Sequence, residues 1–157
     1  MVDACFGNKT TSIEQRRYLG SKTKLLPLID EVLEKEGITY QSFADVFAGT
    51  GVVASHFYDK ADIIVNDILE SNYLSYLAFF GKEQIHTSFL KECLERYNSL
   101  DSKIGHNYFS RNFANTYFDS KNAKRIGYIR QDIENLHLEK KINERERAYL
   151  ITSLIYA

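Results

Sequence analysis

The sequence contains a single proline, Pro27, and only two cysteines, Cys5 and Cys93, among its 157 residues. The cysteines lie far apart and lack the paired spacing of a zinc site or a disulfide framework, which favours plain thiols in a reducing compartment. No window approaches the roughly 20 apolar residues of a membrane span, and the first residues lack the cationic start and apolar run of a signal peptide. We therefore expect a cytoplasmic protein without a membrane segment or a metal site.

Charge of one sign is also lacking, because the formal net charge is -1. No global basic field exists, so any contact with nucleic acid depends on a local patch or on other segments. A chain with 44% hydrophobic and 26% charged residues is long enough to bury one sizeable core. With no internal repeat, low-complexity tract or linker, we expect one domain over residues 15–157, preceded by a loose segment over residues 1–14.

The most informative stretch is residues 43–54, which read Phe-Ala-Asp-Val-Phe-Ala-Gly-Thr-Gly-Val-Val-Ala. Residues 43–47 are apolar apart from Asp45, as expected of a central parallel strand covered on both faces. Gly49 and Gly51 permit a tight turn and a close approach of the backbone to a ligand, and a helix over residues 52–58 follows. This order of elements predicts an α/β unit of the kind that holds nucleotide-like ligands.

Two acids stand at the ends of the expected strands. Asp45 is costly to bury without a partner, so we expect it at the carboxyl end of its strand, facing a ligand or tying down a loop. Residues 62–67 predict a second strand that ends in Asp67, 18 residues beyond Gly49 and near the roughly 20 expected for an acid that binds ribose hydroxyls. A carboxylate accepts from both hydroxyls at once. Asp67 is otherwise a chance strand-end acid, and Ile68 beside it either covers an adenine face or belongs to the core.

The rest of the chain predicts mainly helices. Ser21 is expected to cap a helix that carries Pro27 in its first turns and ends at Gly37. Taken alone, Arg17 and Lys22 are most simply solvated charges beside this helix. Further helices are expected over residues 70–80, 82–97, 123–136 and from Asn143 onward.

Residues 106–130 interleave aromatic side chains with arginine and lysine. Such a mixture can contact nucleic acid through stacking and phosphate pairing. It can equally form a helical unit whose aromatic side chains are buried and whose charges are solvated. Composition slightly favours the second interpretation.

Three motifs occur in order: Arg17-Tyr18-Leu19-Gly20-Ser21-Lys22, then Asp45-Val46-Phe47-Ala48-Gly49-Thr50-Gly51, then Asn66-Asp67-Ile68. In this order they resemble the N-terminal half of the Dam-like adenine-specific DNA methyltransferases. The resemblance implies an α/β, partial Rossmann-like S-adenosylmethionine-dependent methyltransferase fold with added helices. It also implies S-adenosyl-L-methionine as cofactor and double-stranded DNA as the substrate of the complete enzyme, within a restriction-modification system.

The same resemblance implies a role for each matched residue. Eight positions of this sequence would bind the cofactor. They are Tyr18, Lys22 and Asp45 around the methionine end, Phe47, Gly49 and Gly51 lining the cofactor, Asp67 on the ribose, and Ile68 beside the adenine.

The family's catalytic motif, Asp-Pro-Pro-Tyr or a close variant, holds the amine of a flipped adenine. The lone proline, Pro27, excludes that motif from this sequence, so we expect no catalytic residue here. The last helix also reaches Ala157 without a cap, which suggests truncation before the catalytic motif.

Two alternatives remain open. A catalytically inactive truncated or split-enzyme module could bind cofactor, or a second polypeptide that carries the catalytic motif. A nicotinamide dehydrogenase shares the glycine turn and the strand-end acid, but it does not account for the motif from Tyr18 to Lys22 or for Asp45.

Overall fold

The computed structural model describes residues 22–100 and 103–157, so the segment over residues 1–14 lies outside the described residues. The chain divides into two compact units, Met1–Gly81 and Lys82–Ala157. The sequence carries no linker at this point and did not indicate a division there.

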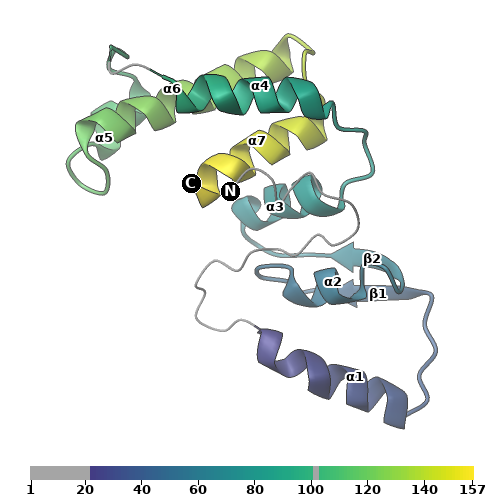
Figure 1. Cartoon of the computed structure of the whole chain (residues 1–157). Coiled ribbons are helices and arrows are strands. Elements are labelled where there is room, and N and C mark those ends of the chain that lie inside the picture. The colour runs from purple at the N-terminus through teal and green to yellow at the C-terminus, as the bar shows by residue number, and fades with distance from the viewer. Residues whose placement is uncertain (1–21, 101–102) are drawn as a thin grey trace. The chain divides into compact units, whose positions relative to one another are not determined.

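The first unit alternates helices and strands (Figure 1). A 3-10 helix, η2, leads into α1, and two strands then alternate with two helices. The bounds are η2 Lys22–Leu25, α1 Leu26–Lys35, β1 Ser42–Asp45, α2 Val52–Phe57, β2 Asp62–Val65 and α3 Glu70–Phe80. The strands pair in parallel, with Ser42 opposite Asp62 and Asp45 opposite Val65. The alternation of helices and strands and the parallel strand pair confirm an α/β organisation. Both strands end at the same edge of the sheet.

Helix α1 has the signals that the sequence predicted. Pro27 lies in its first turn, where a missing N–H breaks no hydrogen bond. Gly37 follows its end with a φ of 60°, and the Ile38 N–H donates to the Leu33 carbonyl at 3.0 Å. These contacts satisfy the last carbonyls of the helix. The expected cap, Ser21, lies outside the described residues.

The core of this unit forms where α2 packs on the sheet. Val52, Val53 and Phe57 are buried there, and the Phe57 ring stacks on Phe43 with centroids 4.1 Å apart. Full burial of a side chain such as Phe57 contributes roughly 2–3 kcal/mol. Partly buried neighbours that pack against this core are Leu26, Ile29, Leu33, Tyr40, Phe43 and Ile63.

The parallel strand predicted over residues 43–47 is confirmed in part, with Asp45 at its end, but the prediction that it is covered on both faces is wrong. Strand β1 ends at Asp45, β2 ends at Val65 rather than at Asp67, and Phe47 is 81% exposed. Ala44 and Ile64 face each other in register, and both are exposed. Helix α2 packs on the face that carries Phe43 and Ile63, so within the described residues the opposite face remains open to solvent.

The second unit is helical. Its elements are α4 Thr87–Asn98, α5 Tyr108–Phe113, α6 Ser120–Leu138 and α7 Glu144–Tyr156. Helix α6 contacts α5 and α7, and α7 also contacts α4. The helix expected from residue 82 begins only at Thr87, because the preceding residues bind the start of α7 instead: His86 N–H donates to Glu146 Oε1 at 2.7 Å. Buried side chains line the helices at Leu90, Cys93, Ile129, Ile133, Leu136, Ala148, Leu150 and Ile151.

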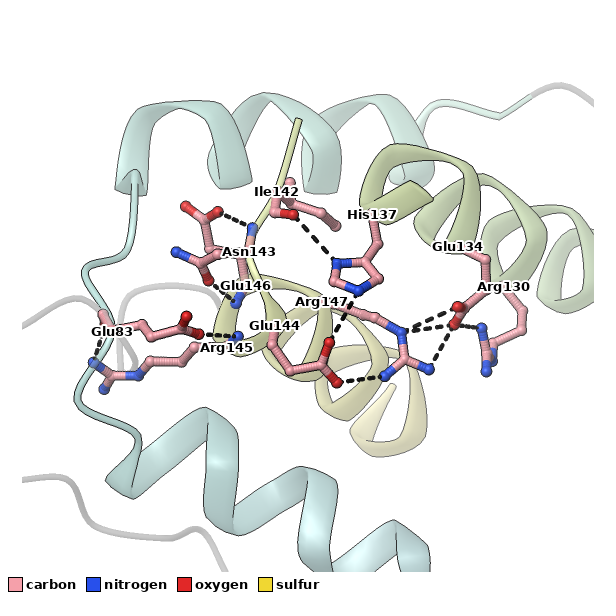
Figure 2. A network of polar contacts seen from close by, with 10 residues as sticks. All are labelled: Glu83, Arg130, Glu134, His137, Ile142, Asn143, Glu144, Arg145, Glu146 and Arg147. Carbon is pink, nitrogen blue, oxygen red and sulfur yellow. Dashed lines mark hydrogen bonds and ion pairs between the residues drawn. The ribbon is translucent and has the colours of Figure 1, made fainter. Parts of the chain in front are cut away.

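Polar contacts fix where α7 begins (Figure 2). Asn143 caps the helix: its side chain accepts from the Glu146 N–H at 2.9 Å, and Glu146 Oε2 accepts from the Asn143 N–H at 2.8 Å. Arg147 joins α7 to α6 by an ion pair of 2.9 Å with Glu134. This capping box confirms the helix predicted to start at Asn143.

The prediction that the aromatic side chains of residues 106–130 are buried is wrong for most of them. Tyr108 is 77% exposed and Tyr117 is 78% exposed. Phe109 contacts Phe113 and Phe118, with ring centroids 4.9 and 5.7 Å apart, yet Phe113, Phe118 and Tyr128 are also exposed. Helix α5 has only six residues, and of the rings that it carries, Tyr108 is mostly exposed and Phe113 is partly exposed. Among the described residues, no helix is both long and apolar enough to cross a membrane.

Candidate functional site

The candidate site lies at the edge where β1 and β2 end. The backbone pairing continues past the strands, since the Asn66 N–H donates to the Asp45 carbonyl and the Ala48 N–H donates to the Asn66 carbonyl, both at 3.0 Å. The chain then turns tightly into α2, with the Gly51 N–H donating to the Ala48 carbonyl at 2.8 Å. The glycine turn is thereby fixed at the carboxyl ends of two parallel strands, where open α/β sheets bind ligands.

Both glycines of this turn adopt left-handed backbone conformations. The φ angles are 56° at Gly49 and 78° at Gly51, and any other L-residue would be strained there by roughly 1–2 kcal/mol. A Cβ placed on Gly49 would meet no atom within 4 Å. The space beside Gly49 is therefore open, and backbone conformation rather than crowding requires glycine at that position.

Asp45 is buried beside a positive charge. Only 7% of its side chain is exposed, and its Oδ1 lies 2.8 Å from Lys22 Nζ. The same ammonium donates to the Phe47 carbonyl at 2.8 Å. The interpretation of Lys22 as a solvated charge is therefore wrong, and its ion pair and hydrogen bond together join three of the predicted positions, Lys22, Asp45 and Phe47.

The second oxygen of Asp45, Oδ2, is buried and has no hydrogen-bond partner among the described residues. A buried carboxylate oxygen without a donor is costly, and burial of such groups is normally accompanied by a partner. Asp45 Oδ2 is therefore a place where a cationic or N–H donor of a ligand would be strongly stabilised.

Asp67 follows β2 and binds the glycine turn directly. Its Oδ2 accepts from the Gly49 N–H at 2.8 Å. Its Oδ1 accepts from the Leu69 N–H at 3.0 Å and from the Asn72 side-chain amide at 3.1 Å. The hydrogen bond from Leu69 is the largest cause that holds the pKa of Asp67 below its ordinary value, and the bonds from Gly49 and Asn72 add to it. Asp67 is therefore a carboxylate at neutral pH, with acceptor capacity left beyond its three donors.

Two apolar side chains stand exposed near this edge. Phe47 is 81% exposed and Ile68 is 97% exposed. The alternative that Ile68 belongs to the core is therefore wrong. Tyr18, the remaining predicted position, lies outside the described residues.

Sequence reasoning missed two side chains of α3 that contact the site. The Tyr76 hydroxyl donates to the Gly49 carbonyl, and Asn72 donates to Asp67. The two are four residues apart and follow the strand-end acid closely, but nothing in the sequence distinguishes them from ordinary helix residues.

Among the described residues, no group of three or more His, Cys, Asp or Glu could hold a metal ion.

Comparison with known proteins assigns a family. A family model described as D12 class N6 adenine-specific DNA methyltransferase matches residues 18–157. Among individual relatives, the modification methylase LlaI of Lactococcus lactis subsp. lactis is 34% identical over 88% of this chain. The type II methyltransferase M.FokI of Planomicrobium okeanokoites is 33% identical over 90% of this chain. No solved structure matches.

Coverage of these relatives is partial. The chain spans 24% of the LlaI methylase and 24% of M.FokI. It spans 43% of the type II methyltransferase M.CviAII of Paramecium bursaria Chlorella virus 1, to which it is 30% identical. Since the family model covers nearly all of this sequence, the chain belongs to the D12 class N6 adenine-specific DNA methyltransferase family.

Proposed function

We propose that the chain is the S-adenosylmethionine-binding part of a site-specific DNA adenine methyltransferase of a restriction-modification system. One observation carries this proposal: two carboxylates, Asp45 at the end of β1 and Asp67 two residues past β2, flank a left-handed glycine turn at one edge of a parallel sheet. This arrangement matches the site that Rossmann-like folds use for cofactors built on a nucleoside. We infer that the complete domain is Rossmann-like, of which β1 and β2 form two strands.

The donor set fits S-adenosylmethionine, which carries an ammonium, a carboxylate, two ribose hydroxyls and an adenine ring. The unpaired Asp45 Oδ2 would accept from the ammonium, and Lys22 would pair with the carboxylate. Asp67 would accept from the ribose hydroxyls. The other proposed positions are Tyr18 at the methionine end, Phe47, Gly49 and Gly51 along the cofactor, and Ile68 at the adenine.

The cofactor, when bound, supplies the methyl group that is transferred to the exocyclic amine of adenine. In this proposal the residues of this chain bind and orient the donor, and the sequence lacks the Asp-Pro-Pro-Tyr motif that would hold the amine. Orientation of a reacting group accounts for a large part of the rate in such transfers. The contribution proposed for Lys22, Asp45 and Asp67 is therefore to hold the cofactor in one position.

The surface around α5 supports double-stranded DNA as the substrate of the complete enzyme. Between residues 103 and 125 the sequence has one acidic residue, Asp119, and five basic residues: Lys103, Arg111, Lys121, Lys124 and Arg125. The exposed rings of Tyr108 and Tyr117 lie within the same stretch. Exposure of these rings favours contact with nucleic acid over the alternative of a buried aromatic core.

A second candidate is a module that completes its site with another polypeptide. The open sheet face supports it, because Ile64 is 58% exposed and Ala44 beside it is exposed, whereas parallel sheets are normally covered on both faces. A segment that supplies further strands at the edges of the sheet, helices over that face and an Asp-Pro-Pro-Tyr-like motif would complete the site. This segment could follow in a longer chain or come from a separate polypeptide.

One experiment with S-adenosylmethionine labelled in its methyl group tests both parts of the proposal. The chain is irradiated with ultraviolet light in the presence of the cofactor, and in parallel incubated with duplex DNA. We expect label crosslinked to the protein and none on the DNA, because no Asp-Pro-Pro-Tyr motif is present in the sequence. Absence of label on the protein would contradict cofactor binding. Label on adenine in the DNA would contradict the conclusion that catalysis needs residues outside this sequence.

A further inference from the structure

Gly49 is held through both of its backbone polar groups. Its N–H donates to Asp67 Oδ2 at 2.8 Å, and its carbonyl accepts from the Tyr76 hydroxyl. Gly49 belongs to no helix or strand. Its φ is 56°, and glycine adopts positive φ angles about as readily as negative ones, so the residue type alone does not fix this conformation. These two side-chain contacts therefore act together with the backbone hydrogen bonds of Ala48 and Gly51 to fix the orientation of the turn.

Both contacts lead to α3. Asn72, near the start of this helix, donates to Asp67 Oδ1 at 3.1 Å, on the carboxylate whose other oxygen binds Gly49. Asn72 and Tyr76 are four residues apart, so they lie on the same face of the helix. The Tyr76 side chain is only 5% exposed, and its ring stacks on Phe80 with centroids 6.4 Å apart. A packed ring fixes the position of its hydroxyl.

We propose that Asn72 and Tyr76 are positioning residues, through which α3 fixes the strand-end carboxylate and the glycine turn in the geometry that binds the cofactor. This inference rests on the proposed function. Neither side chain is placed on the cofactor. Each acts through another group, Asn72 through Asp67 and Tyr76 through Gly49. If the turn is already ordered before binding, the binding free energy does not include the entropic cost of ordering it, so affinity for the ligand is higher.

The Tyr76→Phe variant isolates the hydroxyl, because phenylalanine retains the ring that packs on Phe80. The matched control is Tyr73→Phe, which removes the same group from a residue of α3 that is 57% exposed. We expect Tyr76→Phe to weaken S-adenosylmethionine binding about fivefold in calorimetric titration, as the loss of one hydrogen bond implies. Tyr73→Phe should bind as the unmodified chain does, and both variants should keep their thermal midpoints within a few degrees.

A second measurement needs no ligand. In ¹⁵N–¹H spectra, the Gly49 amide bound to a carboxylate should resonate downfield and exchange slowly with solvent. Tyr76→Phe should accelerate that exchange, whereas Tyr73→Phe should not. In Asn72→Ala, the pH at which this resonance titrates should move upward, because a donor that lowers the pKa of Asp67 is removed. A change in packing alone would not move that titration.

The two measurements separate the possible failures. If the unmodified chain binds no S-adenosylmethionine, the proposed function fails, and the Gly49 resonance still decides whether α3 fixes the turn. If the chain binds the cofactor and Tyr76→Phe binds it equally well, the positioning role is overturned. Unchanged exchange and titration of Gly49 in Tyr76→Phe and Asn72→Ala would also overturn it.

Discussion

The Asp67→Ala variant is expected to bind S-adenosylmethionine about 100-fold more weakly than the unmodified chain, a loss of about 2.7 kcal/mol. Two effects combine in this loss. The ribose hydroxyls would lose a charged acceptor, and the glycine turn would lose the contact between Asp67 Oδ2 and the Gly49 N–H. Calorimetric titration of both proteins at neutral pH, where Asp67 is ionised, measures the difference.

A matched control is available on the same strand. Asp62 begins β2 and is exposed, so Asp62→Ala removes an equal charge from the opposite end and should leave affinity unchanged. Asp67→Asn adds a further test, since it preserves the shape of the side chain but replaces one acceptor oxygen by a donor. Its affinity for S-adenosylmethionine should lie between those of the unmodified chain and Asp67→Ala. Equal binding by the unmodified chain and Asp67→Ala would remove Asp67 from the site.

The sequence predicted much of this site because strand-end acids and glycine turns have local signatures. Asp45, Gly49, Gly51 and Asp67 were identified from their order and spacing alone, and the structure brings Gly49 and Asp67 within 2.8 Å. The partner of Asp45 was not predictable from local pattern, because Lys22 lies 23 residues away. The α3 side chains were missed for the same reason: Tyr76 contacts Gly49 across 27 residues.

The Glu146→Gln variant is expected to lose about 3 kcal/mol of unfolding free energy. Glu146 is only 1% exposed, and its two oxygens accept from His86 at 2.7 Å and from Asn143 at 2.8 Å. An amide retains one acceptor and directs N–H donors at one of these partners, which leaves buried groups unpaired. Urea unfolding followed by circular dichroism measures the change.

Glu144→Gln is the matched control on the same helix. Glu144 is 44% exposed and pairs with Arg147 at 3.0 Å and with His137 at 3.0 Å, as Figure 2 shows. Exposed pairs of this kind contribute less than about 1 kcal/mol. Equal losses in the two variants would contradict the role assigned to the buried carboxylate.

The stability from Glu146 should also depend on pH in a defined direction. Burial raises its pKa, but the hydrogen bonds from the His86 and Asn143 N–H groups, together with the His86 ring, outweigh burial and hold that pKa below the ordinary value. Because the folded state has the lower pKa, the stabilisation is complete above the unfolded value of about 4.3 and declines as pH falls below it. The difference between the unmodified chain and Glu146→Gln should therefore shrink in acid. A difference that grows below about pH 4.3 would contradict this.

As for the site, the parts of the fold that depend on local sequence signals were predicted, and the parts that depend on distant residues were not. Helix α3 has the bounds that were predicted, and α7 begins at the Asn143 cap, because caps and apolar periodicity are local signals. The burial of β1 was mispredicted, since an apolar run indicates burial only if other elements cover it. The aromatic side chains from Tyr108 to Tyr128 were mispredicted because composition does not distinguish a core from a binding surface. Family membership excludes the dehydrogenase alternative.

The most direct test of the cofactor assignment is a calorimetric titration of the unmodified chain with S-adenosylmethionine, alongside one with nicotinamide adenine dinucleotide. Both ligands carry adenosine, but only the first has an amino-acid end to pair with Lys22 and Asp45. We predict saturable one-site binding of S-adenosylmethionine and at most a weak response to the dinucleotide. An equally strong response to the dinucleotide, or none to S-adenosylmethionine, would contradict the assignment.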